Sequence, residues 1–141
     1  MPREEINRIE MELLNYSEYN TQIKNLKLML ENKDYDTLTG IDISAENYNA
    51  SRNSESNIEK KIVEIEKQEL RIKANISRLK VKTKKIEQCI STFNDIENEF
   101  FNLRYLEQLM YTEIQEEMEC SYNKLRKIKH SIIHKCFLQG L

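Results

Sequence analysis

The most informative segment of this chain runs from Tyr111 to Phe137, YTEIQEEMECSYNKLRKIKHSIIHKCF. It predicts two helices, 111–118 and 122–137, joined by the three residues 119–121. Apolar residues recur every three or four positions in the second segment, and Ser121 stands where a helix N-cap is expected. Two short helices with so short a connection are typical of a helix-turn-helix.

The second of these helices carries a polar, basic face. In a helix-turn-helix the second helix enters the major groove, and its N-terminus attracts phosphate. Asparagine and arginine can pair with the edges of adenine and guanine, and lysine suits phosphate. The pattern therefore predicts contacts with double-stranded DNA. The candidate residues are Ser121, Tyr122, Asn123, Lys124, Arg126, Lys127 and His130.

A further helix precedes the pair. Asn94-Asp95-Ile96-Glu97 is a capping sequence and predicts a helix that continues to about Leu106. We expect Ile114 and Met118 to pack against the apolar stripe of the last helix. Residues 94–141 are therefore predicted to form a DNA-binding domain of three helices.

Outward from this domain, residues 56–93 predict one long helix. Its apolar seam has gaps of four and three over five heptads, which predicts burial against another helix. The partner is either residues 1–33, a second predicted helix folded back as an antiparallel hairpin, or a second copy of the chain. Residues 34–55, with few large apolar side chains, predict a linker or loop. The seam positions are Ile58, Ile62, Ile65, Glu69, Ile72, Ile76, Leu79, Thr83, Ile86, Ile90 and Phe93.

Composition supports an all-α fold, because the 141 residues include only two glycines and one proline, and 33% are charged. No apolar run is long enough to cross a membrane, and the three well-separated cysteines suit reduced thiols in the cytoplasm. The net charge of −2 conceals a division: 71–85 holds seven basic and no acidic residues, 107–119 holds five acidic and no basic ones, and 122–141 is basic again. The run at 71–85 suits either extra phosphate contacts or a solvated exterior.

The run from Phe101 to His130 resembles the helix-turn-helix of sigma-70 region 4. The resemblance extends over about residues 90–137 and implies sequence-specific promoter binding. Its matching parts are Leu103-Arg104-Tyr105-Leu106-Glu107, Glu113-Ile114, Glu116-Glu117, Ser121 and the basic tail. It departs from the family at Gln108 and Glu119, which replace glycines, at Gln115, which replaces a small alanine, and at Met110, which replaces a capping residue.

The whole chain resembles, in its order of parts, the phage-encoded regulators of the RinA and ArpU types. These also place a helical half, a linker and a long helix before a region-4-like helix-turn-helix. The resemblance implies an activator of phage late or packaging genes in the cytoplasm of a bacterial host. We expect the N-terminal helices either to oligomerise the protein or to contact RNA polymerase.

Other functions are less well supported by the sequence. We find no nucleophile with a base at a recognised spacing and no phosphate-binding glycine loop, so we expect no catalysis and no cofactor. Cys120, His130, His134 and Cys136 match no common zinc spacing, so no metal is expected. Two alternatives stay open: a DNA-recognition subunit of a packaging machine, similar to small terminase subunits, and a coiled-coil interaction protein that does not bind DNA.

Overall fold

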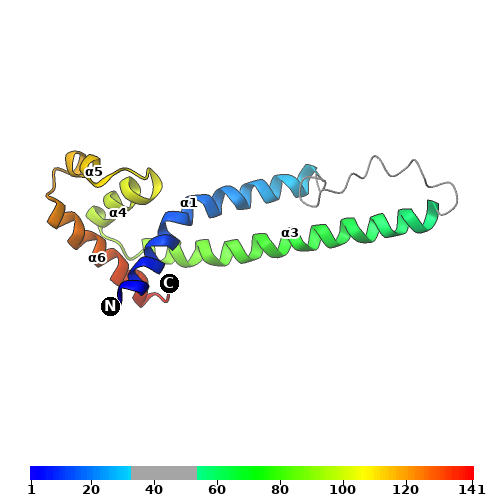
Figure 1. Ribbon diagram of the computed structural model, residues 1–141, viewed down its shortest axis with the longest axis horizontal. Coiled ribbons are helices and arrows are strands. Elements are labelled where there is room, and N and C mark those ends of the chain that lie inside the picture. The colour runs from blue at the N-terminus through cyan, green and yellow to red at the C-terminus, as the bar shows by residue number, and fades with distance from the viewer. Residues whose placement is uncertain (33–53) are drawn as a thin grey trace. The chain divides into compact units, whose positions relative to one another are not determined.

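The computed structural model describes residues 1–32 and 54–141, which form five α-helices and one short π-helix, with no β-strand among them (Figure 1). The predicted all-α fold is confirmed. Residues 34–53 of the predicted linker lie outside the described residues. The elements are α1 (Arg3–Asn32), α3 (Ser54–Ile90), α4 (Asp95–Phe101), the π-helix η2 (Asn102–Leu106), α5 (Tyr111–Met118) and α6 (Tyr122–Leu138).

The chain divides into two compact units, and both long helices contribute to each of them. One unit combines Met1–Thr21 with Lys80–Leu141, and the other is Gln22–Leu79. The first unit contains all of α4, α5 and α6, so the predicted helix-turn-helix is part of it.

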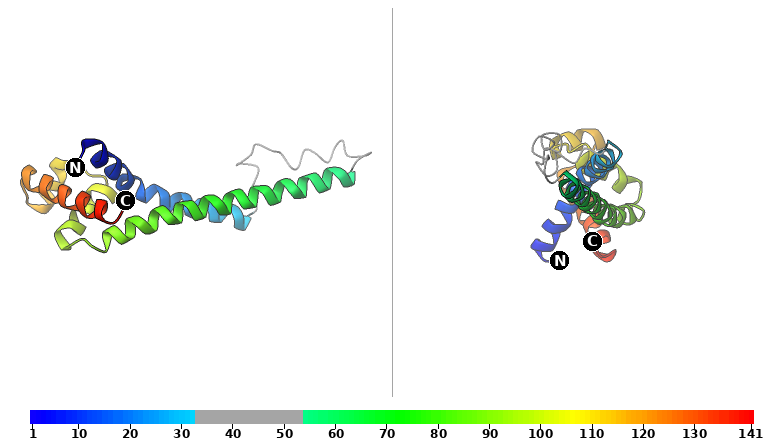
Figure 2. Two further views of the ribbon diagram at one scale, coloured as in Figure 1. Left: turned by 90° about the horizontal axis from the view of Figure 1, so that it is seen from below. Right: turned by 90° about the vertical axis from the view of Figure 1, so that its right-hand side faces the viewer.

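In the unit of residues 22–79, the end of α1 lies beside α3 (Figure 2). Ile23 of α1 is buried, as are Ile72, Ile76 and Leu79 of the predicted seam. Leu26 of α1 and Leu79 of α3 line one small hollow between the two helices. The chain's own first helix therefore covers this part of the seam, as the antiparallel-hairpin alternative predicted.

The chain's own first helix does not cover the beginning of the predicted seam. Ile58 and Ile62 are 53% and 50% exposed, and Ile65 is only partly buried. The reason is length: α1 ends at Asn32, and α3 runs on past that end (Figures 1 and 2). The first turns of α3 thus carry seam residues with no α1 residue opposite them.

In the other unit, the three C-terminal helices share one core with the beginning of α1 and the end of α3. Tyr16 of α1 donates its hydroxyl to Glu87 of α3 at 3.1 Å, and Lys82 of α3 lies 5.1 Å from the ring of Tyr19. A later residue of α1 thus meets an earlier residue of α3, so the two helices are antiparallel here. The fully buried members of the core are Ile9, Leu13, Ile86, Cys89, Phe100, Tyr105, Ile114, Leu125, Ile132 and Cys136.

Aromatic rings join the elements of this core. The ring of Phe101, at the end of α4, lies 6.2 Å from Tyr16 of α1, 5.9 Å from Phe93 after α3, and 5.5 Å from Tyr105 of η2. Burial of a side chain as large as phenylalanine stabilises a fold by roughly 2–3 kcal/mol. Phe101 therefore fixes the C-terminal helices to the end of the hairpin.

The start of α4 confirms the predicted cap. The Asn94 side chain accepts a hydrogen bond from the Glu97 backbone N–H at 2.8 Å, and Glu97 Oε1 accepts one from the Asn94 backbone N–H at 2.9 Å. At the other end, the chain widens into the π-helix, which the sequence did not predict. The Glu107 N–H donates to the Asn102 carbonyl at 2.9 Å, five residues back.

Candidate nucleic-acid interface

The two helices of the predicted helix-turn-helix begin and end close to the predicted residues. α5 ends at Met118 and α6 begins at Tyr122. Ile114 and Leu125 are fully buried in one core, with Met118 packed against it, which confirms the expected contact between the helices. The rings of Tyr111 and Tyr122 also meet edge-on, with centroids 5.6 Å apart. These contacts hold the start of α6 against the start of α5.

The turn between the helices depends on Glu119, which has left-handed backbone angles (φ 52°, ψ 45°). The Glu119 backbone N–H donates to the Gln115 carbonyl. The Cys120 backbone N–H donates to the same carbonyl at 3.2 Å. A left-handed conformation costs roughly 1–2 kcal/mol for a residue with a Cβ. The chain thus keeps, with a glutamate, the tight turn for which the sigma-70 pattern has a glycine.

The N-terminus of α6 is capped as predicted. Ser121 Oγ accepts a hydrogen bond from the Lys124 backbone N–H at 3.2 Å. Such a cap leaves the N–H groups of Tyr122 and Asn123 without a partner inside the helix, and they lie at the positive end of the helix dipole. This is the geometry that favours a phosphate oxygen at a helix N-terminus.

A second left-handed residue, Gln108 (φ 57°), shapes the connection that leads into α5. Across this connection, Arg104 Nη1 donates to the Leu109 carbonyl at 3.0 Å, and its guanidinium lies 4.9 Å from the ring of Tyr111. Arg104 therefore links η2 to the first residue of α5. It positions the brace helix and does not belong to the exposed face of α6.

The predicted contact residues come together on one side of α6. Tyr122, for example, is 49% exposed. Within residues 1–32 and 54–141, the side chains of Lys124, Arg126 and Lys127 form no hydrogen bond or ion pair. We call this set the α6 face; its members, all exposed, are Ser121, Tyr122, Asn123, Lys124, Arg126, Lys127 and His130.

Two other basic residues of α6 point inward and pair with acids. Lys129 Nζ lies 3.0 Å from Glu10 Oε2 of α1, and Lys135 forms an ion pair with Glu97 of α4. Lys135 also donates to the Thr92 carbonyl at 3.3 Å. The positive charge of α6 is thus divided: two lysines hold the helix to the core, and those of the α6 face stay available to a ligand.

Glu97 is the centre of the inward cluster, and its carboxylate is almost fully buried. Burial by itself raises the pKa of such a carboxyl, but hydrogen bonds from the Asn94 backbone, Lys135 and Ser131 outweigh it and hold the pKa of Glu97 below its usual value. The residue is therefore ionised at neutral pH, and the N-terminus of α4 is tied to the middle of α6.

His134 is one residue that the sequence-based contact list omitted. It is exposed and follows Asn123 by eleven positions and His130 by four. Spacings of four and eleven return a helix to nearly the same side, so His134 continues the α6 face by one turn. The helical spacing from Asn123 was the signal that would have found it.

The neighbouring brace helix has the opposite charge. Glu113, Glu116 and Glu117 of α5 are exposed, as is Glu119 in the turn. A polyanion is therefore repelled by α5 and attracted by α6. The exposed charge in this part of the unit is therefore negative on α5 and positive on the α6 face.

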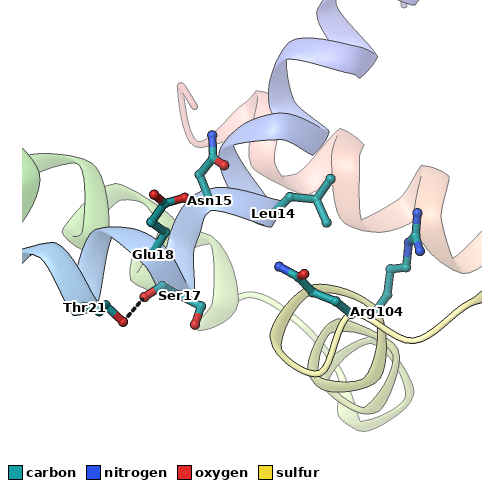
Figure 3. Close-up of a pocket in the computed structure, with 7 residues that line it drawn as sticks. Leu14, Asn15, Ser17, Glu18, Thr21 and Arg104 are labelled. Carbon is teal, nitrogen blue, oxygen red and sulfur yellow. Dashed lines mark hydrogen bonds between the residues drawn. The ribbon is translucent and has the colours of Figure 1, made fainter.

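A hollow of about 560 Å³ lies on another side of the same unit, between α1 and the region of η2 and the connection to α5 (Figure 3). Asn15, Ser17 and Thr21 approach it from α1, and Arg104 turns its guanidinium away from them. The lining combines polar side chains with the apolar Leu14, and the hollow is open to solvent. Within residues 1–32 and 54–141, no group of three histidine, cysteine, aspartate or glutamate side chains is placed to hold a metal ion.

Comparison of the chain with protein-family models, with curated proteins and with solved structures finds no match. No helix in the described part of the chain combines the length and apolar character that a membrane span needs.

Proposed function

We propose that this protein binds double-stranded DNA in a sequence-specific manner through the α6 face and regulates transcription. The observation that carries the proposal is the division of charge on α6. Lys129 and Lys135 are held by Glu10 and Glu97, whereas Lys124, Arg126 and Lys127 are exposed beside a capped helix N-terminus. A basic, exposed helix preceded by a brace and a tight turn is the arrangement that docks in a major groove.

The residues of the α6 face divide by chemistry. Asn123, in the first turn, and Arg126 have the donors and acceptors that pair with adenine and guanine edges. Lys124 and Lys127 supply positive charge for phosphates, together with the free N–H groups at the start of the helix. Tyr122 is half exposed and is held in place by the Tyr111 ring.

The biological setting of the proposal rests on resemblance. The likeness to sigma-70 region 4, and of the order of parts to RinA- and ArpU-type regulators, supports a phage or prophage activator of late genes. In this proposal the protein acts in the bacterial cytoplasm and contacts RNA polymerase at the promoter. It requires no cofactor, and DNA binding involves no catalytic step.

A mobility-shift titration tests the proposal. The DNA is the region upstream of the protein's own gene, with random-sequence DNA as competitor. The Asn123→Ala/Arg126→Ala variant is compared with Glu116→Ala/Glu117→Ala, a control on the exposed side of α5. We expect a shift that survives competitor, is lost in the α6 variant and is kept or strengthened in the α5 variant.

Other outcomes contradict the proposal in different ways. If no shift appears at moderate salt, or if the α6 variant binds as well as the wild type, the α6 face is not a DNA-binding surface. Specific binding by a ring of eight or more copies would instead support the DNA-packaging alternative.

A further inference from the structure

The beginning of α3 has an apolar seam that the chain's own first helix does not reach. Ile58 and Ile62 are about half exposed, although the same heptad spacing leads from them directly into the buried residues Ile72 and Ile76. β-Branched residues at consecutive seam positions are the side chains that pack as knobs into the holes of a facing helix. The seam is therefore exposed near the start of α3 and buried farther along the same helix.

Glu69 marks the place of this change. It occupies a seam position between Ile65 and Ile72 and is only partly buried. A polar residue at one seam position limits the registers and partners that a coiled coil accepts. Ile72, Ile76 and Leu79 are buried in the unit that contains the end of α1, whereas Ile58 and Ile62, before Glu69, are about half exposed.

The charges beside the exposed seam select the orientation of that helix. If Ile62 and Ile65 take the two core positions of a heptad, Lys61 lies on one flank and Glu66 on the other. In a parallel pair of identical helices, Lys61 of each copy faces Glu66 of the other. In an antiparallel pair the same positions bring glutamate toward glutamate and lysine toward lysine, which is repulsive.

We propose that two copies of this chain associate through the start of α3 as a parallel two-stranded coiled coil centred on Ile58, Ile62 and Ile65. The proposal goes beyond DNA binding and does not depend on it. Three seam positions per copy make a small interface, so the association is weak and reversible, in the micromolar range. A dimer of this kind carries two α6 faces.

Sedimentation equilibrium of the full-length chain, without DNA, over about 1–300 µM tests the proposal. We expect a monomer–dimer equilibrium. Lys61→Glu and Glu66→Lys each make two symmetry-related pairs repulsive and weaken the dimer about tenfold. The double variant Lys61→Glu/Glu66→Lys restores attraction and returns the dissociation constant to within about threefold of the wild type.

A second variant removes the apolar contact. Ile58→Gln/Ile62→Gln replaces two seam residues and is expected to leave only monomer over the whole range. Val81→Gln is its matched control, because Val81 is 58% exposed on another side of α3 and its replacement leaves the equilibrium unchanged. Far-ultraviolet circular dichroism of each variant shows whether its helix content is kept.

Three results would overturn the proposal. If the chain stays monomeric at every concentration, a second copy does not cover Ile58 and Ile62. Failure of the charge exchange to restore the dimer excludes the parallel arrangement. Dimerisation that survives Ile58→Gln/Ile62→Gln places the interface elsewhere. If the chain is monomeric at every concentration and still binds DNA, the first of these results leaves the proposed function intact.

Discussion

Lys135 of α6 donates to Glu97 of α4, and the same carboxylate closes the N-terminal cap of α4 through the Asn94 backbone. Ser131, one turn before Lys135, donates to the other oxygen of Glu97. One buried side chain therefore joins the start of α4 to two successive turns of α6. The position of the α6 face depends on this cluster, although no residue of the cluster belongs to that face.

Replacement of Glu97 by glutamine is expected to lower the free energy of unfolding by about 2 kcal/mol. The change removes the charge that Lys135 pairs with, and the cost is below that of a fully buried pair because Lys135 is 31% exposed. Urea denaturation followed by circular dichroism measures it. Asp95→Asn, an exposed acid in the same turn, is the control and should cost only a few tenths of a kcal/mol. Equal losses in the two variants would contradict the structural role of Glu97.

The contribution of Glu97 should depend on pH in a defined direction. Its folded-state pKa lies below the value of about 4.3 that glutamate has in an unfolded chain. Its stabilisation is therefore complete above that value and is lost as the pH falls through the folded-state pKa. We expect the difference in unfolding free energy between the wild type and Glu97→Gln to shrink between pH 5 and pH 3. A difference that stays constant over this range would refute the assignment.

Replacement of the two left-handed residues by glycine is expected to stabilise the fold, whereas the change at Glu97 destabilises it. Gln108→Gly and Glu119→Gly should each raise the free energy of unfolding by about 0.5–1 kcal/mol, because glycine adopts a positive φ without strain. Thermal unfolding of the single variants measures the effect. Glu117→Gly, inside α5, is the control and should instead destabilise by about 1 kcal/mol. Loss of stability in all three variants would show that the two positions are not left-handed.

The cap of α6 can be tested on its own. Ser121→Ala removes the oxygen that accepts from the Lys124 N–H and should lower the free energy of unfolding by about 1 kcal/mol. Ser121→Asn keeps an acceptor at this position and should stay within a few tenths of a kcal/mol of the wild type. If alanine and asparagine behave alike, the hydrogen bond contributes nothing to stability.

Local patterns predicted the C-terminal helices well, because their signals lie within a few residues of each other. The Asn94–Glu97 cap, the Ser121 cap and the ends of α5 and α6 are all of this kind. The resemblance to sigma-70 region 4 identified Gln108 and Glu119 as substituted glycines, and both residues have the backbone conformation that a glycine favours.

Contacts between distant parts of the chain were beyond a sequence-based prediction. Nothing near Lys129 indicates that its partner is Glu10, and 38 residues separate Lys135 from Glu97. Helical spacing left Lys129 and Lys135 out of the predicted DNA contacts, but it did not predict the acids that hold these two lysines. The same limit applies to Ile58, whose exposure depends on where α1 ends.

The salt dependence of DNA binding tests whether the α6 face is the surface that contacts DNA. Fluorescence anisotropy measures the dissociation constant on the upstream DNA between 50 and 300 mM salt. Lys124→Gln/Lys127→Gln should weaken binding and reduce the slope of log affinity against log salt by about two, because each phosphate contact contributes about 0.9. Lys24→Gln/Lys27→Gln, which removes two exposed charges from α1, should leave the slope unchanged. Equal slopes in the wild type and the α6 variant would contradict the account.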